Sequence, residues 1–99
     1  MNTNTYGTTE LRKEFGRLTF GKALEAHRKC EELTQAAFAK LLGISAQSLC
    51  DIEKGRRVPT PKRAAKIAAQ IGQPANFWIQ LAFQDMLDNE HLNYKVSVA

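Results

Sequence analysis

Apolar residues recur along this chain at a spacing of three to four, which is the period of an amphipathic helix. Glycine, proline or a capping residue interrupts this pattern between segments, so that it predicts five helices. They cover residues 19–33, 35–42, 46–54, 61–71 and 75–89. The last segment is apolar around much of its circumference, so one face can cover the core and the rest requires another partner.

The clearest start signals belong to the two short segments on either side of Gly43. Thr34 and Ser45 each precede a helix, where a side-chain oxygen can accept an orphan backbone N–H. A hydrophobic staple accompanies each cap, formed by the pairs Leu33 with Phe38 and Ile44 with Leu49. Glycine tolerates the left-handed backbone that ends a helix and turns the chain. Farther along, Thr60 followed by Pro61 is another strong helix start.

The C-terminal tail has a different period. Apolar and polar residues alternate from Leu92 to Val98, which predicts a half-buried β-strand. Because a lone strand leaves its backbone groups unpaired, we expect it to pair with the N-terminal arm, with its copy in a second subunit, or with another protein. The predicted fold class is therefore all-α, a bundle of five helices with a short C-terminal β-strand.

Positive charge is concentrated in one segment. The net charge is +4, yet six basic residues and no acidic residue lie between positions 54 and 66, namely Lys54, Arg56, Arg57, Lys62, Arg63 and Lys66. The chain before this segment is balanced, and the chain after it is slightly acidic. The excess begins where the third predicted helix ends, which favours a polyanion partner near this point. The alternative is a solvated basic loop.

Composition and spacing argue against several classes. The chain has no run of some 18 apolar residues that could span a membrane, and its polar N-terminus lacks the apolar core of a signal peptide. We therefore expect a cytoplasmic protein. Cys30 and Cys50 are expected to be buried or half-buried free thiols. His27 and Cys30 have no second pair at ligand spacing, so no metal or other cofactor is expected. Nothing resembles a phosphate loop or a nucleophile–base arrangement, which predicts that the protein is not an enzyme.

The segment LTQAAFAKLLGISAQSLCDIEKGRRVP resembles the helix-turn-helix of phage repressor and Cro-type regulators, the XRE family. The resemblance covers about residues 18–72 and implies a lambda-repressor-like DNA-binding domain. It divides the chain into an N-terminal arm (1–17), this domain (18–72), and a C-terminal helix and strand for dimerisation (73–99). The continuation FWIQLAFQ is more weakly similar to HigA-type antitoxins.

In this family the second helix of the motif enters the major groove and reads bases with its N-terminal residues. By position, the residues that would face base edges are Ala46, Gln47, Ser48 and Asp51. Those that would contact phosphate are Gln35, Ser45, Lys54, Arg56 and Arg57. Gln47 is the best reader, because its amide can both donate and accept toward adenine, whereas Asp51 can accept from cytosine. The resemblance also implies an ion pair between Arg28 and Glu53 that fixes the recognition helix.

The excess apolar surface of the last helix and the tail predicts a homodimer interface. The residues expected there are Phe77, Trp78, Leu81, Phe83, Tyr94 and Val96. The function implied is a sequence-specific repressor that binds a palindromic operator in double-stranded DNA as a homodimer. One alternative is an antitoxin that also neutralises a toxin protein, and another is a protein-interaction module without DNA binding.

Overall fold

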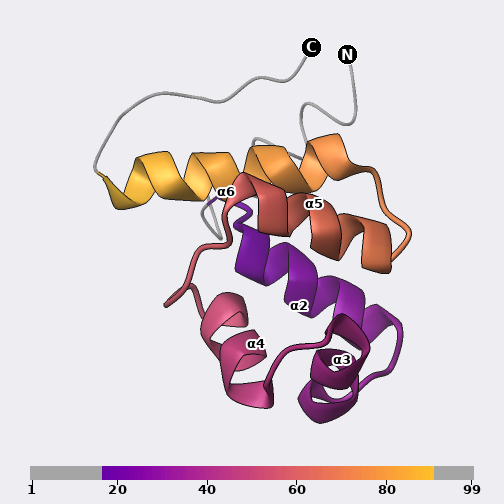
Figure 1. The fold of residues 1–99 in the computed structure, drawn as a ribbon. Helices are drawn as coiled ribbons and strands as arrows, with labels where there is room; N and C mark the ends of the chain where they lie inside the picture. The colour runs from indigo at the N-terminus through magenta and orange to yellow at the C-terminus, as the bar shows by residue number, and fades with distance from the viewer. Residues whose placement is uncertain (1–16, 91–99) are drawn as a thin grey trace, which may run out of the picture.

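The computed structural model describes residues 17–90, in which five α-helices form the secondary structure. They are α2 (Phe20–Cys30), α3 (Gln35–Leu42), α4 (Ala46–Glu53), α5 (Pro61–Gln70) and α6 (Ala75–Asn89). Figure 1 shows α2 in the middle of the molecule, with α3 and α4 at one end and α5 and α6 at the other. The most extensive contact is between α5 and α6, while α2 touches both α4 and α6. The five predicted helices are confirmed. Helix α4 lies far from α6, at the other end of the molecule.

Side-chain caps explain where four of the helices begin. The hydroxyl oxygens of Thr19, Thr34, Ser45 and Thr60 each accept the backbone N–H three residues farther on, at 3.0–3.2 Å. Pro61 occupies the first turn of α5, where its missing N–H has no intrahelical role. Each cap contributes roughly 0.5–2 kcal/mol to stability. The caps expected at Thr34, Ser45 and Thr60 are therefore confirmed.

A residue with a left-handed backbone lies in the turn on either side of α3. Gly43 has a φ of 74°, and the N–H of Ile44 donates to the carbonyl of Ala39 at 3.0 Å, which closes the turn between α3 and α4. Helix α2 ends at Cys30 rather than near residue 33. The reason is a left-handed backbone at Glu32, with a φ of 58°, which ends the helix. Leu33 is thereby free to pack against the core ahead of α3.

A single hydrophobic core joins all five helices. Its buried members are Phe20, Ala23, Leu24, Phe38, Ala39, Leu42, Leu49, Ile52, Ala64, Ile67, Ala68, Trp78 and Ala82. Phe20 from α2 meets Trp78 from α6 edge to face, with ring centroids 5.2 Å apart. Such aromatic pairs add about 0.5–1.5 kcal/mol beyond their buried area. The core therefore links the α3–α4 end of the molecule to the α5–α6 end through α2.

Gly21 marks the closest approach between α2 and α4. A Cβ at this position would collide with the carbonyl oxygen of Ile52 and would lie 2.8 Å from that of Glu53. Both neighbours are backbone atoms, which cannot rotate away as a flexible side chain would. The absence of a side chain at Gly21 thus allows the end of α4 to rest directly on α2.

Asp85 fastens α6 to the start of α2. Its buried carboxylate accepts the backbone N–H of Phe20 at 3.0 Å and is also paired with the guanidinium of Arg17. Arg17 reaches a second carboxylate as well, that of Asp88, at 2.7 Å. A buried acid that meets both a cation and an N–H donor remains satisfied. These interactions hold the two ends of the described chain together.

The predicted fold class requires one correction. We expected a short C-terminal β-strand, but residues 17–90 fold into helices alone, and the segment to which the strand was assigned lies outside the described residues. Within residues 17–90 the fold is all-α. Alternation of apolar and polar residues does not by itself make a strand, since a strand needs an edge to pair with, and the helices described here offer none. No helix in residues 17–90 is long and apolar enough to cross a membrane.

Candidate nucleic-acid interface

One face of α4 is exposed and polar, while the other is buried. Leu49 and Ile52 point into the core. On the opposite side Ala46 and Gln47 are exposed, and Ser48 and Asp51 are half-buried. Since residues three and four apart share a face of a helix, α4 presents Gln47, Ser48 and Asp51 together, and Ala46 is exposed at the start of the helix.

The two serines at the start of α4 form a local network. Ser45 accepts the backbone N–H of Ser48 at 3.0 Å, and its own hydroxyl donates to the hydroxyl oxygen of Ser48 at 2.9 Å. Because the hydroxyl hydrogen of Ser45 is used in this bond, Ser48 keeps its own hydrogen for another acceptor. Ser45 therefore acts first as the cap of α4, and Ser48 is the free hydroxyl donor of the pair.

Asp51 is engaged by two neighbours on the exposed face. Its Oδ1 accepts from Nε2 of Gln47 and from Nε of Arg56, each at 3.0 Å. The hydrogen bond from Arg56, followed by that from Gln47, lowers the pKa of the Asp51 carboxyl below its ordinary value. The same pair raises the pKa of Arg56. The acid on this face thus remains ionised and is accompanied by a positive charge.

Glu53 lies at the buried end of α4, where three helices meet. Its carboxylate accepts hydrogen bonds from Nε of Arg28 at 2.8 Å and from Nη2 of the same guanidinium at 3.2 Å. The pair was expected from the family resemblance, and the bond to Glu53 raises the pKa of Arg28. Gln35, expected on phosphate, directs Nε2 to Glu53 at 2.9 Å instead. The side chain of Gln35 therefore positions α3 against α4 in this structure.

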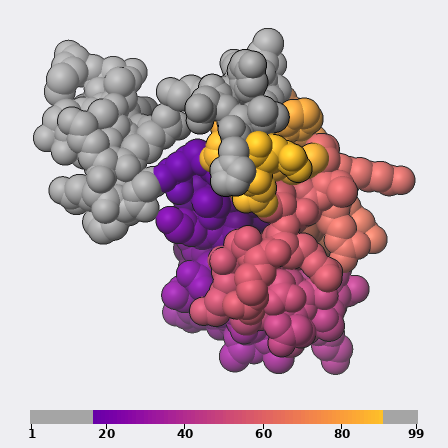
Figure 2. All heavy atoms as spheres, turned by 90° about the vertical axis from the view of Figure 1, so that its left-hand side faces the viewer, coloured from indigo at the N-terminus to yellow at the C-terminus, as the bar shows by residue number. Residues whose placement is uncertain are grey.

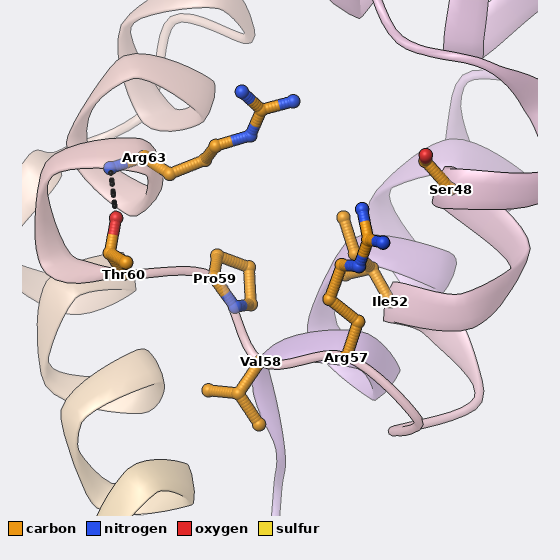
Figure 3. A pocket seen from close by; sticks show the side chains of 7 residues that line it. All are labelled: Ser48, Ile52, Arg57, Val58, Pro59, Thr60 and Arg63. Carbon is orange, nitrogen blue, oxygen red and sulfur yellow. Dashed lines mark hydrogen bonds between the residues drawn. The ribbon is translucent and has the colours of Figure 1, made fainter.

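A hollow of about 310 Å³ separates α4 from the start of α5. Its walls are formed by Ser48, Ile52, Arg57, Val58, Pro59, Thr60 and Arg63. Figure 3 shows the guanidinium groups of Arg57 and Arg63 projecting on either side of this space, with the hydroxyl of Ser48 beyond Arg57. Two positive charges, hydroxyl groups and the positive end of a helix dipole share the hollow, which suits it to an anionic group.

The sequence prediction did not include Arg63 among the site residues. Its signal was present in the sequence, because the Thr60–Pro61 start places Arg63 in the first turn of α5. There its backbone N–H donates to the hydroxyl oxygen of Thr60 at 3.2 Å, and its side chain lies beside the hollow.

The six basic residues between positions 54 and 66 are all exposed. In Figure 2 the surface of the segment that links α4 to α5 (pink) lies below that of α6 (yellow).

Other chemistry is sparse in the described part of the chain. No group of three or more His, Cys, Asp or Glu residues between positions 17 and 90 could hold a metal ion. Both cysteines are free thiols, and Cys50 is half-buried as expected, whereas Cys30 is exposed because it lies at the end of α2, away from the core.

The residues expected at a dimer interface differ in exposure. Phe77 and Phe83 are 44% and 42% exposed, and Met86, which was not predicted, is 40% exposed. Leu81 is half-buried. Trp78 is 3% exposed and belongs to the core, where it fills the space against Phe20. Tyr94 and Val96 lie outside the described residues. An apolar surface therefore remains on α6, without Trp78.

Comparison with known proteins agrees with this geometry. The helix-turn-helix family model matches residues 24–78, more than half of the chain, including the whole of α3 and α4. No solved structure was found to match the chain.

Three curated relatives are similar to part of the chain. YazB of Bacillus subtilis, named an uncharacterized HTH-type transcriptional regulator, is 46% identical over 41% of this chain and 59% of its own length. MJ0272 of Methanocaldococcus jannaschii, named in the same way, is 45% identical over 50% of this chain and 74% of its own length. The ImmF control region 10 kDa protein of Bacillus phage phi105 is 39% identical over 57% of this chain and 62% of its own length.

The aligned region therefore spans about three fifths of two of these relatives and about three quarters of the third. The region matched by the family model carries α3, the turn at Gly43 and α4. From the family match and this geometry, the chain belongs to the helix-turn-helix family, in the XRE type shared by Cro/C1-like regulators.

Proposed function

We propose that this protein is a sequence-specific DNA-binding repressor that acts as a homodimer on a palindromic operator. The observation that carries the proposal is the arrangement of the exposed polar face of α4 beside the hollow lined by Arg57 and Arg63. A helix with short polar side chains fits the major groove. Cations at its end fit the phosphates that border that groove.

Each side chain then has a distinct role at the DNA. Gln47 and Ser48 face base edges, where an amide can donate and accept and a hydroxyl can do either. The contacts to phosphate come from exposed cations, namely Lys54, Arg57 and Arg63, with Arg56 held close by. Gln35 contributes through the backbone N–H groups at the start of α3, since its side chain is directed to Glu53. Ser45 supports the site by capping α4.

The dimer contact is proposed on α6. Its exposed Phe77, Phe83 and Met86 form apolar surface that a second copy would cover. Because α6 lies at the opposite end of the molecule from α4 (Figure 1), a partner on α6 leaves the recognition helix accessible. In a two-fold dimer of this type, recognition helices lie about 34–36 Å apart, one turn of B-DNA. The operator would then be an inverted repeat.

The relatives favour regulation over neutralisation of a toxin. Two are named transcriptional regulators, and the third is named a phage control-region protein. A control-region protein of a phage fits a repressor that sits at an operator. The proposal for this chain therefore follows the regulator assignment.

Selection of duplexes from a random DNA pool tests the proposal. We expect the bound sequences to share an inverted repeat whose half-sites are about one helical turn apart. Sedimentation of the complex should give two protein chains per duplex. A pool that stays random after several rounds would contradict sequence-specific binding, and a single half-site bound by one chain would contradict the dimer.

A further inference from the structure

Asp51 connects the reading face of α4 to the basic segment that follows it. Its Oδ1 accepts one hydrogen bond from Gln47 Nε2 and another from Arg56 Nε, each at 3.0 Å. Its backbone oxygen also accepts the N–H groups of Arg56 and Arg57, at 2.8 and 3.2 Å. Asp51 therefore contacts the groups on both sides of it that would face DNA.

The hydrogen bond to Asp51 fixes which end of the Gln47 amide points outward. An ionised carboxylate can only accept hydrogen bonds, so it can bond the nitrogen of the amide and not the oxygen. One amide hydrogen is used in this bond. The oxygen and the second hydrogen of Gln47 remain available on the exposed side of α4. A free glutamine could instead rotate to present either end of its amide.

This orientation favours one base over another. In the major groove adenine presents an amino donor at N6 beside an acceptor at N7, whereas guanine presents two acceptors, N7 and O6. The outward oxygen of Gln47 matches the amino group of adenine, and the remaining amide hydrogen matches N7. Against guanine the same oxygen would face O6 of the base, and two acceptors cannot form a hydrogen bond with each other. The held amide is thus complementary to adenine and mismatched to guanine.

We propose that Asp51 is a positioning residue that sets the base preference of Gln47 to adenine, an inference that rests on the proposed DNA-binding function. Asp51 does not read a base itself, since its Oδ1 is already occupied by Gln47 and Arg56. The guanidinium of Arg56 also accompanies its negative charge at the DNA surface. The specificity of this helix then depends on a pair of residues one turn apart, held by a cation from the following loop.

Binding measurements with single base changes test this role. Gln47→Ala first identifies the base pair that Gln47 reads, as the position in the selected duplex where preference disappears. At that position we expect wild type to prefer adenine over guanine by roughly 5- to 150-fold. Asp51→Ala should bring this ratio close to one while it strengthens binding to unrelated duplexes, because an acid has been removed. Glu90→Ala removes the same charge from the exposed end of α6 and should retain the wild-type ratio.

The possible failures can be told apart. An Asp51→Ala protein that keeps the full adenine preference overturns the inference. An Asp51→Ala protein that instead loses a preference for cytosine at a different base pair also overturns it, because Asp51 would then read a base itself. A wild-type protein that binds no duplex overturns the proposed function and this inference with it.

A second readout needs no DNA. In nuclear magnetic resonance spectra of the free protein, Asp51→Ala should move the side-chain amide signals of Gln47 toward those of a freely rotating glutamine. Glu90→Ala should leave them in place. Signals that do not move in Asp51→Ala would overturn the positioning role even if base preference changed.

Discussion

The guanidinium of Arg28 and the carboxylate of Glu53 form a two-point ion pair, with N–O distances of 2.8 and 3.2 Å, where α2 meets the end of α4. The carboxylate side chain is fully buried, and that of Arg28 is 12% exposed. Gln35 adds a third donor to the same carboxylate. The orientation of the recognition helix therefore depends on one buried acid.

Removal of this buried charge should be costly. Glu53→Gln leaves the guanidinium of Arg28 without its counter-charge in a largely buried site, and such one-sided loss costs about 3–5 kcal/mol. Urea unfolding followed by Trp78 fluorescence measures the free energy of unfolding. Glu25→Gln is the control, since Glu25 forms an exposed pair with Lys29 at 3.7 Å and such pairs contribute less than about 0.5 kcal/mol. Equal effects of the two substitutions would contradict the structural role of Glu53.

Gly21→Ala tests the close approach of α2 and α4. The new methyl group would collide with the carbonyl of Ile52, so α4 must move. Overpacking of this kind costs typically about 1–3 kcal/mol, and we expect DNA affinity to fall as well because the recognition helix is displaced. Ala26→Gly, at an exposed position of the same helix, is the control for helix propensity, and it should cost about 1 kcal/mol without a matching loss of affinity. A Gly21→Ala protein with wild-type affinity would argue against the close approach.

The titration of Asp51 should report its pairing with Arg56. In the folded protein the hydrogen bond from Arg56 lowers the carboxyl pKa below its ordinary value of 3.8. Since a lowered folded pKa favours the ionised form, the stabilising effect is present above pH 3.8 and is lost as pH falls through the folded value. Carboxyl chemical shifts followed against pH give this pKa directly. Arg56→Ala should move it back toward 3.8, and an unchanged titration would mean that Arg56 is not its cause.

Phe83→Glu should separate dimerisation from folding. Phe83 is 42% exposed on α6, so a charge there is solvated in the monomer and would be buried in the proposed dimer. Sedimentation should show a monomer at tens of micromolar, where we expect wild type to be a dimer, while circular dichroism stays unchanged. Leu41→Glu, at an exposed position of α3, should leave the dimer intact. A Phe83→Glu dimer would remove α6 from the proposed interface.

Local chemistry was readable from the sequence, and non-local packing was not. Thr34, Ser45 and Thr60 act on N–H groups three residues away, so a short segment suffices to predict each cap. The close approach at Gly21 involves a helix some thirty residues later in the chain, which no local pattern encodes. Likewise, the apolar ring of Trp78 fits a core and an interface equally well until the packing of Phe20 against it is known.

The candidate site shows the same division. The family resemblance placed Gln47, Ser48 and Asp51 on one face of α4, because helical spacing alone fixes that arrangement. It did not predict that Arg56 folds back on Asp51 after the turn at Gly55, since a loop decides this interaction. The assignment of Gln35 to phosphate did not anticipate its bond to Glu53, for which the nearby ends of α3 and α4 are required.

The salt dependence of DNA affinity tests the central proposal most directly. Fluorescence anisotropy would give Kd for the selected duplex at several salt concentrations, for wild type, Arg57→Ala and the control Lys66→Ala. Because phosphate binding by cations releases counterions, we expect wild-type affinity to fall by about two orders of magnitude or more between roughly 50 and 200 mM salt. Arg57→Ala should weaken binding to all duplexes and reduce the salt slope by about two, since each protomer of the dimer then neutralises one phosphate fewer, whereas Lys66→Ala should change it less. Affinity that is independent of salt, or no binding even at low salt, would contradict the account.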